Sequence, residues 1–168
     1  MLISHHQLRA GASRIFLAAG SQPEEAEIVT DHLVEANLRG HDSHGVGMIP
    51  TYLGHLRAGS LVANSRGRIL RDDGTTLIYD GERGYGQIAA RTVTSLGIER
   101  AHETGIVVIA LRNSHHIGRV GSYGEQCAAA GLVSLHFVNV TGHRPYVAPH
   151  RGSDARLATN PAAAHCSP

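Results

Sequence analysis

Tryptophan and lysine are absent from this chain of 168 residues, and phenylalanine and cysteine occur only twice each. With only Cys127 and Cys166 available, disulfides are not expected to organise the fold. No apolar run approaches the ~20 residues that span a bilayer, and the first residues lack the basic start and apolar run of a signal peptide. We therefore expect a cytoplasmic protein without a membrane partner.

Neither positive nor negative charge is in excess, because the formal net charge is only +1. The fifteen basic residues are all arginines and are scattered, so the chain has no electrostatic footprint for a nucleic acid. With 42% apolar and 17% charged residues, the composition is that of a globular protein. Histidine is abundant, with 13 residues, and imidazole is the side chain suited to acid/base chemistry near neutral pH.

The first third of the chain predicts helices. Ser4 precedes a segment with apolar residues at helical spacing. Ser21 and Glu24 predict a capping box at the start of a second helix. A glycine-broken loop, HDSHGVGMIP (41–50), follows, and Pro50 opens a short third helix.

The pattern then changes to that of an α/β region. Two short strands around the turn signal DDG predict a hairpin within 68–79, and a helix is expected over 87–103. The β-branched run IVVIAL (106–111) predicts a strand that is buried on both faces. With the helix expected over 122–131 and a second strand over 132–138, it predicts a βαβ unit with parallel strands, and no further strand is expected afterwards.

Together these patterns predict an α/β fold in two parts. The boundary divides a helical N-terminal part, residues 1–62, from an α/β part, residues 63–168. The α/β part is expected to be incomplete, because its predicted sheet is small for the apolar strands that it contains.

The stretch RNSHHIGRVGSYG (112–124) follows a predicted strand and precedes a helix, which is where ligands bind in open α/β sheets. Its glycines, Gly118, Gly121 and Gly124, do not have the G-x-G-x-x-G spacing of a Rossmann phosphate loop. They are compatible with an anion site at the helix start or with a simple tight turn.

Adjacent histidines at 115 and 116 are a poor metal site, because consecutive side chains of an extended segment point to opposite sides. We expect one to work as an acid/base and the other to orient the loop. In HDSHG (41–45), Ser43 and His44 are a candidate nucleophile and base, although neighbours in sequence rarely have triad geometry. A capped turn with solvated histidines is an equal alternative there.

These motifs together resemble the type 2 malate/L-lactate dehydrogenase family. The resemblance includes GHDSHGVGMIPTYL, GERGYGQIAA, the segment 106–140 and ATNP, in that order between Leu8 and Pro161. It implies an oxidoreductase that uses NAD or NADP to interconvert a small 2-hydroxy acid and its 2-oxo acid, in a homodimer. It also implies a helical N-terminal part and a non-Rossmann, mixed-sheet nicotinamide-binding domain like that of sulfolactate dehydrogenase.

The resemblance also implies site residues. His116 corresponds to an acid/base, His44 to a proton donor or cofactor contact, and Ser43 lies beside the substrate. Cofactor contacts are implied for His44, His116, Ile117, Gly118, Arg119 and Asn160. No metal ligand is implied; a histidine-rich metal-binding module without redox activity is the alternative hypothesis.

Two departures from the family pattern bear on activity. Met48 stands where several relatives carry an arginine that would hold a substrate carboxylate, which leaves that role to Arg119 or to a residue outside this chain. Family members also continue well beyond the motif ATNP. The chain is therefore expected to be a truncated or frame-shifted member that is inactive alone.

Overall fold

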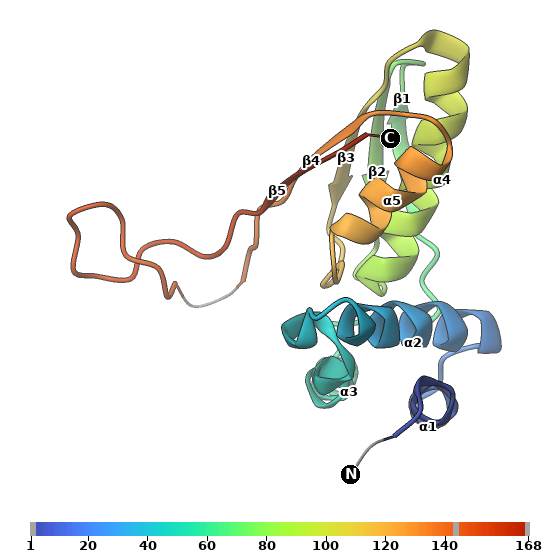
Figure 1. Cartoon of the computed structure of the whole chain (residues 1–168), viewed down its shortest axis with the longest axis vertical. Coiled ribbons are helices and arrows are strands. Elements are labelled where there is room, and N and C mark those ends of the chain that lie inside the picture. The colour runs from blue at the N-terminus through green and yellow to red at the C-terminus, as the bar shows by residue number, and fades with distance from the viewer. Residues whose placement is uncertain (1–2, 143–144, 167–168) are drawn as a thin grey trace. The chain divides into compact units, whose positions relative to one another are not determined.

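The computed structural model describes residues 3–142 and 145–166, and Figure 1 shows its course. Two compact units divide the chain, residues 1–123 and 124–168. In chain order the elements are α1 His5–Ala18, α2 Pro23–Leu38, the 3-10 turns η1 Asp42–His44 and η2 Val46–Met48, α3 Ile49–Arg57, β1 Arg68–Asp72, β2 Thr76–Asp80, α4 Gly86–Thr104, β3 Val108–Arg112, α5 Gly121–Ala129, β4 Ser134–Phe137 and β5 Ala162–His165.

The three predicted N-terminal helices are present, but one of their caps was predicted wrongly. The N-cap of α1 is Ser4, whose side chain accepts a hydrogen bond from the backbone N–H of Gln7 in a complete capping box. The predicted box of Ser21 and Glu24 does not form, because Gln22 is the N-cap of α2. Ser21 is buried instead.

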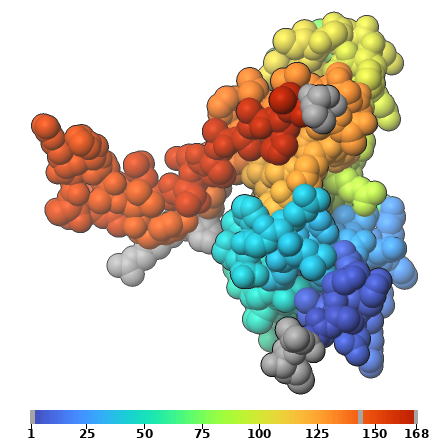
Figure 2. Space-filling model, viewed as in Figure 1, coloured from blue at the N-terminus to red at the C-terminus, as the bar shows by residue number. Residues whose placement is uncertain are grey.

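The helices pack into one core of the first unit. Aromatic rings lie at its centre, with Phe16 6.5 Å from Tyr52 and 5.7 Å from Tyr85 between ring centroids. Leu33 from α2 and Leu61 complete a layer that excludes water. In Figure 2 the residues of α1, α2 and α3, blue to cyan, form one continuous mass.

The same unit contains a three-stranded sheet in the order β1-β2-β3. The predicted hairpin is present, since β1 and β2 pair antiparallel. Strands β2 and β3 pair parallel, and α4 makes the crossover between them. One face of the sheet packs on α4, where Leu77 and Tyr79 meet Ala89 and Val93. Helix α2 lies across the N-terminal end of α4 (Figure 1).

Two predictions about the later strands were wrong. Alternate residues of β3 are exposed, with Val108 62% exposed, so this strand is not buried on both faces. The predicted parallel pair of β3 and β4 is absent among the described residues, because β3 pairs with β2 and β4 pairs antiparallel with β5. A run of apolar residues indicates a strand. It does not determine which other strand pairs with it, or whether one or both of its faces are buried.

The second unit holds this small β4–β5 ladder. Strand β5, Ala162–His165, is an element that the sequence did not predict. In the described part of the long connection between the two strands, Val147 and Leu157 form an isolated antiparallel bridge. Across the described parts of both units, no helix combines the length and apolar character needed to cross a membrane.

The predicted helical part and mixed sheet are therefore both present in an α/β fold. The predicted boundary at residues 62 and 63 stays a prediction. Leu61, just before it, packs in one core with Tyr85 and Ile88 from beyond it.

Candidate active site

Two glycine-rich segments follow the parallel strands β2 and β3, namely GERGYG (81–86) and NSHHIG (113–118). Their backbones are hydrogen-bonded to each other. The backbone N–H of Arg83 donates to Asn113 O at 2.7 Å, and that of His115 donates to Gly84 O at 3.1 Å. Arg83 and Asn113 both have positive φ, of 58° and 49°, so tight left-handed turns shape both segments. The pairing holds the backbone of the histidine motif at the end of the sheet.

Helix α4 starts directly against this backbone. A Cβ on Gly86 would lie 2.3 Å from His115 O and 2.4 Å from His116 O, closer than real Cβ contacts. Only glycine allows the first turn of α4 to approach the two histidines so closely. The glycine of GERGYGQIAA therefore has a packing role beside the site.

His116 lies on a buried hydrogen-bonded chain. Its Nδ1 is 2.7 Å from the hydroxyl oxygen of Tyr52, on α3, and Gln87 Nε2 donates to that same oxygen at 2.7 Å. Tyr52 is fully buried and Gln87 is 1% exposed. The ring of His116 is thus held from one side by groups of two different helices.

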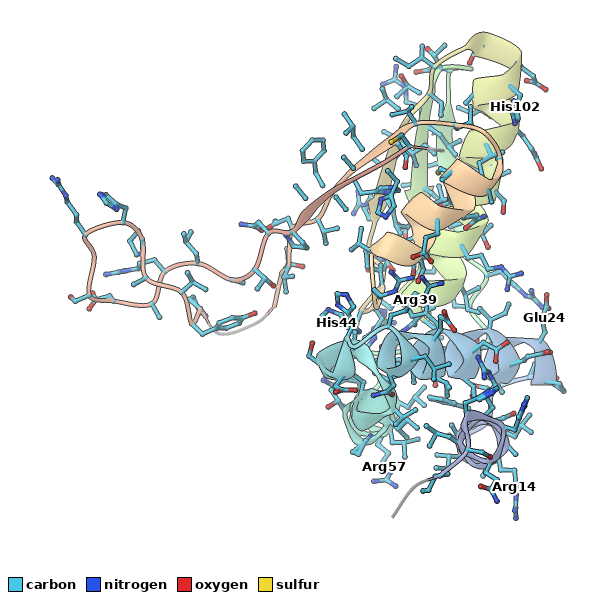
Figure 3. The ribbon with its side chains drawn as sticks, viewed as in Figure 1. Arg14, Glu24, Arg39, His44, Arg57 and His102 are labelled. Carbon is cyan, nitrogen blue, oxygen red and sulfur yellow. The ribbon has the colours of Figure 1, made fainter. Side chains whose placement is uncertain are left out.

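His44 covers the ring of His116. The two imidazoles are stacked, with ring centroids 5.2 Å apart and an angle of 29° between their planes. Ser43 Oγ is 2.9 Å from His44 Nδ1, so the neighbouring hydroxyl orients that ring. Burial, and to a lesser degree nearby His41, lowers the pKa of His44, which favours its neutral form. Figure 3 labels His44 in the segment between α2 and α3.

His115 shares the contact with Tyr52 but has a different imidazole as its partner. Its Nε2 is 2.7 Å from His55 Nδ1, on α3, and its ring packs edge-on against Tyr52 at 5.3 Å. The adjacent histidines therefore contact different imidazoles, as expected for consecutive residues of an extended segment. Which histidine exchanges a proton stays a prediction.

The turn after His116 is fixed by a histidine of α2. His32 Nε2 accepts a hydrogen bond from the backbone N–H of Arg119 at 2.9 Å. Gly118 has φ of +73°, and a Cβ there would lie 2.3 Å from His32 Nε2. Burial, with the nearby Arg119 charge, lowers the pKa of His32 to about 4, so the ring is a neutral acceptor at neutral pH.

The implied cofactor contacts fall into two groups. Ile117, Gly118 and Arg119 form the turn beside His116; the Tyr123 hydroxyl donates to Ile117 O, and Arg119 is 9% exposed. Asn160 belongs to the second unit and is exposed. The structure brings the first group, Ser43, His44 and His116 into one neighbourhood.

Two other features bear on ligands. Among the described residues, no group of three or more His, Cys, Asp or Glu side chains is arranged to hold a metal ion. A cavity of about 180 Å³ lies elsewhere in the first unit, and none of the histidines described above lines it. Its lining residues are Gln22, Glu24, Glu25, Ile28, Asn64, Arg66 and Ile88. That volume is below the range of cofactor sites, so chemistry is better sought at the histidines.

Sequence reasoning missed four of the side chains that organise this site. Tyr52 and His55 are three residues apart on α3, so their shared helix face was a usable signal. His32 is a residue of the second helix, and its partner, the backbone N–H of Arg119, is 87 residues away in sequence. Nothing in the local sequence marks Gln87, whose partner is 35 residues away.

Comparison with known proteins identifies the family of this chain. Residues 3–167 match the family described as Malate/L-lactate dehydrogenase, and the chain belongs to that family. Hydroxycarboxylate dehydrogenase B of Escherichia coli strain K12 is 52% identical over 147 residues, which are 88% of this chain and 40% of that protein.

Solved structures agree as well. Malate dehydrogenase from Pyrococcus horikoshii superposes with a TM-score of 0.92 at 32% identity, over 99% of this chain and 47% of that one. Sulfolactate dehydrogenase from Methanocaldococcus jannaschii gives 0.91 at 29% identity, over 98% and 47%. The chain thus spans less than half the length of these relatives.

Proposed function

We propose that the protein to which this chain belongs is an oxidoreductase that interconverts a small 2-hydroxy acid and its 2-oxo acid with NAD or NADP. The observation that carries the proposal is the stacked pair His44 and His116, held by Ser43 on one side and by Tyr52 on the other. Membership of the dehydrogenase family supports the reaction class.

The reaction needs a proton at the substrate oxygen whenever a hydride reaches the carbonyl carbon. Imidazole is the side chain that exchanges protons near neutral pH, and two such rings lie together here. We assign the exchange with the substrate oxygen to His116 and the support of that ring to His44. Ser43, hydrogen-bonded to His44, keeps the second ring in its orientation.

The donor set of this chain fits a nicotinamide group. Imidazole nitrogens donate and accept hydrogen bonds, as a carboxamide requires, and the turn Ile117–Arg119 adds backbone groups beside them. When bound, the cofactor carries the hydride to or from the substrate carbon. Asn160 is proposed as a further cofactor contact.

The proposal names the class of substrate, a small 2-oxo acid, and the next question is which residue binds its carboxylate. Met48 is half-buried and packs against the helical core, and a thioether does not bind a carboxylate. Arg119 is the cation of the histidine turn, but its side chain is buried. A substrate carboxylate is therefore proposed to bind to a residue outside the chain or to Arg119 after a local rearrangement.

A chimera tests the proposal. The matched segment of the E. coli relative is replaced by that of this chain, and oxidation of NADH and NADPH is followed with a panel of 2-oxo acids. We expect turnover with at least one acid. Silence of a folded chimera across the whole panel, with both cofactors, would refute the proposed function.

A further inference from the structure

Gln87, Tyr52 and His116 are joined by two hydrogen bonds in series. The order of donors and acceptors along them is not required by the proposed reaction. Gln87 Nε2 carries two hydrogens and no acceptor lone pair, so the Tyr52 oxygen is the acceptor in that bond. A tyrosine hydroxyl has a single hydrogen. With Gln87 donating to its oxygen, that hydrogen is available to His116 Nδ1, 2.7 Å away.

Burial makes this direction persistent. Tyr52 and Gln87 are shielded from water, so neither group can exchange its protein partner for solvent at no cost. Burial also raises the pKa of Tyr52 well above its ordinary value, so the hydroxyl keeps its hydrogen throughout the neutral range. His116 Nδ1 therefore faces a permanent donor.

We propose that Tyr52, oriented by Gln87, is a positioning residue that fixes the neutral ring of His116 as the tautomer with its hydrogen on Nε2. Since Nδ1 accepts from the tyrosine, the ring hydrogen must lie on the opposite nitrogen. Stacking on His44 fixes the plane in which that N–H points.

The consequence for the site rests on the proposed function. A carbonyl oxygen only accepts hydrogen bonds, so the resting ring presents the donor that a 2-oxo acid needs. A neutral imidazole N–H can polarise a carbonyl without bringing a full charge. The resting ring is therefore preset to bind a 2-oxo acid through a hydrogen bond to its carbonyl oxygen.

Nitrogen NMR of the ¹⁵N-histidine-labelled chain tests the tautomer directly. Magic-angle-spinning spectra, recorded where the ring is neutral, are insensitive to association, and His116→Gln identifies the signals of His116. We expect an unprotonated Nδ1 and a protonated Nε2. A protonated Nδ1 in the wild-type chain would overturn the proposal, whatever the variants do.

Two variants and a matched control complete the test. In Tyr52→Phe both tautomers should become populated, so the Nδ1 signal moves upfield and the Nε2 signal downfield. Gln87→Met should shift them in the same direction, because Tyr52 can then accept from Nδ1–H. Tyr79→Phe, which removes the buried hydroxyl bond to Arg66 O, should leave them unchanged.

Unmoved His116 signals in Tyr52→Phe would also overturn the proposal. These spectra need neither substrate nor cofactor. A failure of the proposed reaction would therefore leave the tautomer assignment standing, and a wrong tautomer would leave the reaction class standing.

Discussion

The histidines of the first unit differ in their hydrogen-bond partners, and these partners separate their roles. His116 and His115 contact side chains of α3, while His32 accepts from the backbone of the turn that follows them. His44 has a neighbouring serine as its partner and lies on the face of His116. One cluster thus contains a proposed proton-exchanging group, its cover and a support of the loop.

Acid should destabilise the first unit through His32. The pKa of this ring is lowered from 6.5 to about 4, so the unfolded chain binds the proton more tightly than the folded one. The contribution of His32 to stability is complete above pH 6.5 and declines as the pH falls to about 4. The difference corresponds to a loss of at most ~3 kcal/mol.

Urea unfolding between pH 7.5 and 4 measures this loss. The variant His32→Gln keeps an acceptor for the Arg119 N–H but does not titrate, so its stability should fall less steeply over the same range. Equal pH dependence of the two proteins would contradict the assignment of His32 as a neutral acceptor.

Loss of the His116 imidazole should remove most activity of the chimera. His116→Ala is expected to lower kcat by the ~10²–10⁴-fold typical of a lost general acid/base. His44→Ala should lower the rate and weaken cofactor affinity, and the ratio of the two effects shows which role dominates. His102→Ala, at the exposed C-terminal end of α4 (Figure 3), is the control and should behave as wild type.

The sequence nominated His44 and His116, because each stands in a polar, glycine-rich motif, and the structure stacks their rings. The sequence analysis did not identify Tyr52 or Gln87. Tyr52 reads as an apolar residue of an amphipathic helix, and its partner His116 is 64 residues away. Side-chain hydrogen bonds across such separations depend on tertiary packing, which periodicity does not encode.

At the scale of elements, the site depends on how closely the start of α4 approaches the histidine loop. Gly86→Ala should destabilise the first unit by about 1–3 kcal/mol, because the new methyl group meets backbone oxygens that cannot rotate away. Gly11→Ala is the matched control. It lies in α1 with open space around its Cβ position, so alanine should stabilise that helix by ~0.5–1 kcal/mol.

Thermal unfolding followed by circular dichroism compares the two alanine variants with the wild-type chain. The expected changes have opposite signs. A Gly86→Ala protein as stable as the wild type, with unchanged His116 resonances, would show that α4 does not hold the loop.

The elements themselves were predictable where local patterns determine them. The capped helix α1, the hairpin β1–β2 and the glycine stop of α4 at Gly105 follow from residue spacing and turn chemistry, and all three are present. The pairing of β3 and the existence of β5 were not predictable. Both depend on which distant strand supplies the partner, and the short segment AAAH of β5 has no strand propensity of its own.

At the scale of the whole chain, each unit exposes large apolar side chains on its strands or beside them. Ile106 and Val108 are more than 60% exposed in the first unit, and Leu135 and Phe137 are 67% and 80% exposed in the second. Such strands are prone to pair with other chains. We expect the 168-residue chain to self-associate, and to show neither saturable NADH binding nor turnover by itself.

Light scattering after size-exclusion chromatography measures the association, and fluorescence titration measures NADH binding. The double variant Leu135→Lys and Phe137→Glu should shift the material toward monomer. A monomeric wild-type chain with micromolar NADH affinity would contradict this prediction on both counts.

The bond between the Arg119 N–H and His32 has a consequence for isotope exchange. Most backbone amides exchange with deuterium more slowly as the solution becomes more acidic, down to the rate minimum. The Arg119 amide is protected by a titrating side chain, so its protection factor should fall as His32 is protonated and can no longer accept. The nearby His115 amide, bonded to the Gly84 carbonyl, should keep its protection over the same range. Within this loop, the exchange rate of the Arg119 amide would then report the ionisation of His32 on α2.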